Sequence, residues 1–227
     1  MRLQICLFTL YLKALFMPVQ DESLKELQHI KKMMERSTKF SSISGFSAIA
    51  AGLCALAGIW LVVQTIAAWR HEHAGRLSDS HDYLATQLLL IAIGTFAAAA
   101  ITSFIFICLR CKKLGIPVLG MSARRVIINI AIPLVIGCLF TLRLATSGSY
   151  ELIAPACLIF YGLALINASK YTLGEIRYLG FTELIIGMAS LWLLGYGLIF
   201  WGIGFGLVHI IYGILIWWRY ERVPGKE

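Results

Sequence analysis

Two ionisable side chains, Glu183 and His209, lie inside long apolar stretches of this 227-residue chain. A charge near the centre of a bilayer costs about 2.5–3.5 kcal/mol on insertion scales, so such residues are candidates for binding a proton, an ion or a ligand. The alternative for His209 is a structural role. Gly202, Gly206 and Gly213 have the spacing of one helix face that includes it, and small residues let a second helix approach closely. Two hypotheses therefore stay open: a proton or ligand contact, and a packing face that His209 joins by a hydrogen bond.

Other polar residues lie at a similar depth to Glu183 or just outside the apolar runs. They are Asn129, Asn167, Lys170, Glu175 and Arg177. We expect this group to form one polar cluster with Glu183 at the cytoplasmic mouth of a helix bundle. The cluster would be either an access point for a solute or a proton, or an ion pair between Glu183 and Lys170 or Arg177.

Three histidines, His71, His73 and His81, are weak candidates for metal binding. Imidazole suits zinc, copper and nickel, but a His-x-His pair does not place both rings on one helix face, so we predict no bound metal. No second histidine lies in an apolar run opposite His209, which argues against haem, and we predict no cofactor. The signature motifs of hydrolases, metalloproteases and nucleotide-binding enzymes do not occur, so we predict that the chain is not an enzyme.

The elements that would position these residues are membrane-spanning helices. Hydrophobic residues make up 59% of the chain, charged residues 14%, and the mean hydropathy is +0.79. A soluble domain needs more charge on its surface, whereas about 20 apolar residues span a bilayer. Residues 179–218 carry one formal charge and are long enough for two crossings, so we expect a break at Gly195-Tyr196-Gly197. The sequence predicts an all-α, polytopic bundle over 44–218, with six transmembrane helices at about 44–69, 84–109, 126–143, 152–169, 179–194 and 198–218.

Lysine and arginine are distributed unevenly between the two sides of these spans. Fifteen lie in the N-terminal flank, the second and fourth loops and the tail over 219–227, and three lie in the first and third loops. Cytoplasmic loops carry such an excess, so both termini are predicted to be cytoplasmic. The net charge of +8 is therefore a topology signal, and because no nucleic-acid-binding motif accompanies it we predict no nucleic-acid partner.

Residues 17–43 are predicted to contain a cytoplasmic, interfacial amphipathic helix. Leu24, Leu27 and Ile30 follow a helical stripe with lysines elsewhere. We expect this helix to rest on the anionic headgroups of the lipid bilayer or, alternatively, to pack on a partner or a second copy. Residues 1–16 have no small-residue cleavage site, and Lys13 interrupts their apolar stretch, so we expect an over-called extension before a true start at Met17.

The second half of the chain resembles an uncharacterised family of small, six-span bacterial inner-membrane proteins. The similar stretches are residues 129–133, NIAIP; residues 154–187, APACLIFYGLALINASKYTLGEIRYLGFTELIIG; and residues 195–213, GYGLIFWGIGFGLVHIIYG. The resemblance continues weakly through residues 24–125 and does not cover residues 1–16. It implies a bacterial cytoplasmic (inner) membrane and brings no activity with it.

Two classes of function remain open for a chain of this kind. We favour a non-enzymatic accessory or scaffold membrane protein, which forms a homo-oligomer or binds another membrane protein through its glycine faces. The alternative is a small-solute or proton-coupled transporter or channel that uses Glu183 and His209. The two differ in whether water reaches His209.

Overall fold

The computed structural model describes residues 44–72, 81–115 and 117–222, with His81 and Asp82 described by their backbone alone. These residues belong to one compact unit over Phe40–Glu227. The expected amphipathic helix over 17–43, the expected extension over 1–16 and most of the tail over 219–227 lie outside the described residues.

Every regular element among the described residues is a helix. In chain order they are α2 (Gly45–Glu72), α3 (His81–Leu114), α4 (Met121–Thr146), the short 3-10 helix η1 (Tyr150–Leu152), α5 (Ile153–Ala168), the 3-10 helix η2 (Ser169–Tyr171), α6 (Gly174–Trp192), α7 (Gly197–Trp201), the π-helix η3 (Gly202–Val208) and α8 (His209–Tyr220). The all-α class predicted from the apolar runs is therefore confirmed for this part of the chain.

Five segments are long and apolar enough to cross a membrane. They are Gly45–Glu72, Tyr83–Leu114, Met121–Thr146, Tyr150–Tyr171 and Gly197–Tyr220. About 20 apolar residues are enough to span a bilayer, so by length and composition the chain is a multi-pass membrane protein. The helix α6 has 19 residues but carries Glu175, Arg177 and Glu183, and it is not among the five.

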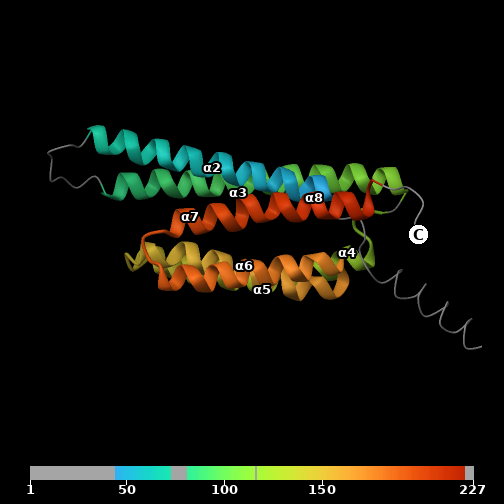
Figure 1. Cartoon of the computed structure of the whole chain (residues 1–227). Coiled ribbons are helices and arrows are strands. Elements are labelled where there is room, and N and C mark those ends of the chain that lie inside the picture. The colour runs from blue at the N-terminus through green and yellow to red at the C-terminus, as the bar shows by residue number, and fades with distance from the viewer. Residues whose placement is uncertain (1–43, 73–80, 116, 223–227) are drawn as a thin grey trace, which may run out of the picture. The chain divides into compact units, whose positions relative to one another are not determined.

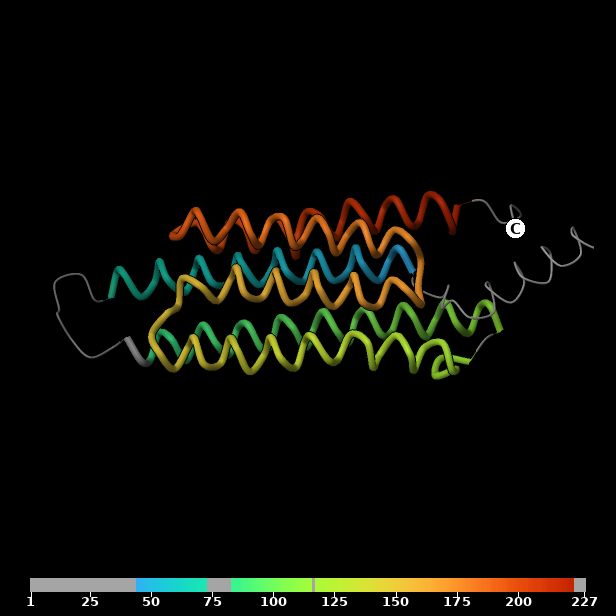
Figure 2. Tube along the Cα trace, turned by 90° about the horizontal axis from the view of Figure 1, so that it is seen from below, coloured from blue at the N-terminus to red at the C-terminus, as the bar shows by residue number. Residues whose placement is uncertain are grey.

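The helices pack side by side and α7–η3–α8 holds the bundle together. Helix α2 packs on α3 and on α8, while α5 packs on α4 and α6. The continuous α7–η3–α8 segment runs between α2 on one side and α5 and α6 on the other, as Figure 1 shows. Figure 2 shows from below that the helices run lengthwise alongside one another. Its position lets it contribute side chains to both halves, and the candidate site lies along it.

Pairs of glycines bring the helix backbones into direct contact. A Cβ atom added to Gly162 of α5 would lie 2.7 Å from the carbonyl oxygen of Gly180 on α6, and one added to Gly180 would lie 2.8 Å from that of Gly162. Helices α2 and η3 meet in the same way, since a Cβ at Gly52 would lie 2.7 Å from the carbonyl oxygen of Gly206. Small residues allow this close approach, which lipid-embedded helices use in place of a hydrophobic driving force.

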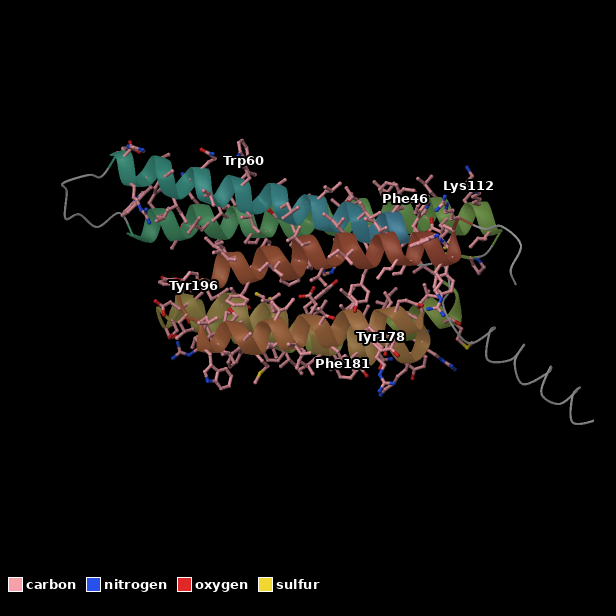
Figure 3. All side chains as sticks on the ribbon, viewed as in Figure 1. Phe46, Trp60, Lys112, Tyr178, Phe181 and Tyr196 are labelled. Carbon is pink, nitrogen blue, oxygen red and sulfur yellow. The ribbon has the colours of Figure 1, made fainter. Side chains whose placement is uncertain are left out.

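The chain reverses direction between α6 and α7 within residues 193–196. Gly195 has a φ of +95°, a backbone conformation that residues with a Cβ rarely adopt. Tyr196 precedes α7 and is exposed, and Figure 3 shows it at one end of the bundle, with Lys112 at the other. The turn lies where the sequence predicted a break.

A carboxylate just after α8, the last described helix, caps the first described helix, α2. Glu221 accepts a hydrogen bond of 2.6 Å from the backbone N–H of Gly45 and one of 3.2 Å from the hydroxyl of Ser44. It also forms an ion pair with Arg110 of α3. An acidic group at a helix N-terminus satisfies free N–H groups and interacts favourably with the helix dipole. Glu221 thus ties together α2, α3 and the end of α8.

Replacing Glu221 with alanine is expected to lower the free energy of unfolding by about 1–2 kcal/mol, the usual cost of losing an N-terminal cap. The measurement is thermal or denaturant unfolding of the purified protein in lipid nanodiscs. Glu72, an exposed carboxylate at the other end of α2, supplies the control. Equal losses for Glu221→Ala and Glu72→Ala would contradict the capping role.

Candidate functional site

The two ionisable residues singled out in the sequence, Glu183 and His209, face each other across the interface between α6 and α8. The Nδ1 atom of His209 lies 3.3 Å from Oε1 of Glu183. Glu183 is fully buried, and His209 is 4% exposed. This separation pairs an acid with a base, and the surrounding helices bury both side chains.

Two further groups hold the His209 ring in place. Its Nε2 atom lies 2.8 Å from the hydroxyl oxygen of Tyr161 on α5, and its Nδ1 atom lies 3.0 Å from the carbonyl oxygen of Gly204. The ring also stacks on Phe205, with 6.0 Å between the ring centroids. Both ring nitrogens therefore have a defined partner, which fixes the orientation of the imidazole.

Gly204, which lies in the π-helix η3, leaves the space that the Glu183 carboxylate occupies. A Cβ atom at Gly204 would lie 2.5 Å from Oε2 of Glu183 and 2.5 Å from Cδ2 of Leu158. A side chain at position 204 would therefore displace the carboxylate. Single π-turns inside α-helices occur frequently at functional sites, where the extra residue changes the direction of neighbouring side chains.

His209 does not share the glycine face on which the sequence placed it. Gly202, Gly206 and Gly213 face α2, where added Cβ atoms would meet Ile59, Leu56 and Ile49. His209 instead points toward α5 and α6. The residues from Gly202 to Val208 form a π-helix, in which each residue rotates less about the helix axis than in an α-helix. The expected face assumed regular α-helical rotation through 202–209.

The expected polar cluster at the cytoplasmic mouth is not one cluster. Among the described residues no ion pair joins Glu183 to Lys170 or Arg177. Lys170 is exposed, and the guanidinium carbon of Arg177 lies 5.6 Å from the ring centroid of Phe181. Glu183 pairs with His209 because α6 turns it toward α8, whereas Arg177 lies on an exposed face of α6.

The remaining members of the expected cluster find separate partners. Glu175 forms an ion pair of 3.0 Å with Arg219 and accepts hydrogen bonds from Tyr220. The side-chain amide of Asn167 donates a hydrogen bond of 2.9 Å to the backbone carbonyl of Asn129. The first contact links α6 to α8 and the second links α5 to α4, so both are helix-to-helix links.

The structure describes the side chain of His71 alone among the three histidines that the sequence offered as weak metal ligands. His71 is exposed in the last turn of α2. His73 lies outside the described residues, and His81 is described by its backbone alone. No group of three potential ligands occurs in the part of the chain that the structure covers.

Tyr161 is the member of the candidate site that the sequence analysis did not identify. Tyrosines near the ends of apolar runs act as interfacial anchors, but Tyr161 lies near the middle of the run over 152–169. A buried tyrosine hydroxyl needs a hydrogen-bond partner, and this one has His209. The sequence does contain a signal for this contact, because a tyrosine in the middle of one apolar run can hydrogen-bond a histidine in the middle of another.

The completed site consists of the Glu183 carboxyl group from α6, the His209 imidazole from α8 and the Tyr161 phenol from α5. Such a group of side chains can hold or pass on a proton. Comparison of the chain with known protein families, with curated proteins and with solved structures found no match.

Proposed function

We propose that this chain is a non-enzymatic accessory or scaffold protein of a membrane, built around a closed helix bundle. The observation that carries the proposal is the burial of both intramembrane ionisable side chains, with Glu183 fully buried and His209 at 4% exposure. A conduction path needs polar groups that water or a solute can reach. The glycine contacts add support, because they join the helices without leaving space between the backbones.

We also propose six spans, with both termini in the cytoplasm of a bacterial inner membrane. Helix α6 would be the sixth span, since its 19 residues make about 28 Å of helix and two of its three charges lie in its first turn. Its central charge, Glu183, has His209 as a partner. The bacterial location rests on the resemblance of residues 154–187 and 195–213 to small inner-membrane proteins.

If α6 crosses the membrane, cysteines at its two ends will react from opposite sides. Lys170→Cys and Tyr196→Cys place single thiols at exposed positions before and after α6, in a background without the native cysteines. We expect a membrane-impermeant maleimide to label residue 170 in inverted vesicles and residue 196 in intact cells. Labelling of both from one side would show that α6 does not cross.

The closed bundle predicts that thiols flanking Glu183 on its own face are protected. Ile176 and Ser190 lie seven residues before and after it on α6, and their exposures are 6% and 1%. In Ile176→Cys and Ser190→Cys we expect maleimide labelling to fall at least about tenfold below that of Tyr196→Cys, from either side, since burial excludes the reagent. Denaturation should restore full labelling, which confirms that the thiols are intact.

Proton-coupled transport is the second candidate, and the Glu183–His209 pair is the observation that favours it. Ionisable groups inside a bundle are costly and commonly mark proton or ion pathways. Labelling of residue 176 or 190 from one side would indicate a water path to the pair. That result would replace the accessory proposal by transport, and the reactive position would identify the open side.

A further inference from the structure

We propose that Glu183, His209 and Tyr161 form a buried proton-binding site, which stores one proton between α6 and α8 without net charge. The proposal concerns how many protons the site holds at equilibrium. It therefore does not depend on whether the protein acts as a scaffold or as a transporter, and a failure of either function leaves it intact.

The position of one hydrogen follows from the backbone. The carbonyl oxygen of Gly204 can only accept a hydrogen bond, and it lies 3.0 Å from Nδ1 of His209. Nδ1 must therefore carry a hydrogen and donate it to this carbonyl. His209 is therefore either the neutral ring with its hydrogen on Nδ1 or the imidazolium with a hydrogen on both ring nitrogens.

The other ring nitrogen reports which of these two forms is present. Nε2 lies 2.8 Å from the hydroxyl oxygen of Tyr161. In the neutral ring, Nε2 accepts the hydrogen of the Tyr161 hydroxyl, whereas in the imidazolium Nε2 donates to the same oxygen. The direction of this one hydrogen bond is thus tied to the charge of His209.

The buried surroundings couple His209 to Glu183. Neither carboxyl oxygen of Glu183 has a hydrogen-bond partner among the described residues, and Oε1 has only the ion-pair distance of 3.3 Å to Nδ1. An unbalanced charge in such a place is strongly disfavoured. Two balanced arrangements remain, a carboxylic acid with a neutral ring and a carboxylate with an imidazolium. Each holds one proton besides the hydrogen on Nδ1.

The other titratable groups nearby do not supply that balance. Within the described residues, Tyr161 is the titratable side chain that hydrogen-bonds to the pair from α5. Cys157 lies one turn before it, and Tyr212, one turn after His209 on α8, shares a hydrogen bond with Thr182.

On α6, Glu175 pairs with Arg219 and Arg177 lies over Phe181. Helix α2 presents the apolar side chains of Leu56 and Ile59 to η3.

The test is a count of protons on both partners in the full-length protein in lipid nanodiscs near neutral pH. The infrared difference between wild type and Glu183→Gln reports whether Glu183 is a carboxylic acid or a carboxylate. Nitrogen-15 NMR of histidine-labelled protein, assigned with His209→Gln, reports whether His209 carries one or two hydrogens. If the glutamine variant does not fold, Glu183→Asp replaces it in the infrared comparison. Aspartate keeps a carboxyl group but shifts its infrared band, so the band of residue 183 can still be assigned.

One proton in total supports the proposal, whichever partner carries it. A carboxylate beside a neutral ring, or a carboxylic acid beside an imidazolium, would overturn it. Tyr161→Phe removes the group that Nε2 contacts, so we expect the Nε2 resonance of His209 to move while the proton count stays at one. An unmoved resonance would show that Tyr161 is not part of the site. A change in the count would overturn the inference that Glu183 and His209 balance each other's charge without Tyr161.

Discussion

Replacing Gly180 with alanine is expected to lower the free energy of unfolding by about 1–3 kcal/mol or more, the range found when atoms are forced into a packed interface. The new Cβ atom would lie 2.8 Å from the carbonyl oxygen of Gly162 and 2.9 Å from the backbone nitrogen of Ile166. Both obstacles are backbone atoms on α5, so no side-chain rotation relieves the clash. Helices α5 and α6 would have to move apart, which also moves Glu183 away from its position beside His209.

Gly94 provides a matched control for this prediction. It lies inside α3, and a Cβ atom there would meet nothing within 4 Å. Gly94→Ala should leave stability unchanged or raise it by up to about 1 kcal/mol, because alanine is the better helix former. The measurement is unfolding of the purified variants in the same nanodiscs. Equal stability of Gly180→Ala and Gly94→Ala would show that α5 and α6 are not packed backbone to backbone.

The positions of the helices could be predicted because length and hydropathy decide them. The predicted span over 44–69 corresponds to Gly45–Glu72 and the one over 84–109 to His81–Leu114. A bilayer leaves few alternatives, since every backbone polar group in its core must be paired within a helix or a barrel. Even the reversal between α6 and α7 could be located, because Gly195 supports a backbone conformation that other residues avoid.

The partners of the polar residues could not be predicted, because they depend on helix rotation and on contacts between distant segments. Sequence spacing assigned Glu183 to Lys170 or Arg177, its neighbours along the chain. Its actual partner, His209, lies on another helix and reaches it through a π-turn. An i→i+5 turn has no simple signature in sequence, and the glycine-rich run over 202–206 fits a regular packing face equally well.

His209→Ala is expected to lower the free energy of unfolding by about 2–5 kcal/mol, because it removes a large buried side chain and leaves buried polar partners unpaired. The substitution leaves Glu183 without its base and Tyr161 without its hydrogen-bond partner, and it opens a space beside Phe205. Unfolding of the purified protein in nanodiscs measures the loss. Leu194→Ala, at an exposed position in the turn after α6, is the control and should lose far less.

Replacing the whole polar site should recover that loss. A triple variant, Glu183→Met, His209→Leu and Tyr161→Phe, removes every member together and keeps similar volumes, and well-packed apolar replacements of buried ionic groups are often neutral or stabilising. We expect its stability to lie within about 1 kcal/mol of the wild type. A triple variant as unstable as His209→Ala would mean that the bundle needs these hydrogen bonds to fold. Recovery would mean that the fold does not need them, and that stability does not account for two ionisable side chains that add an insertion cost.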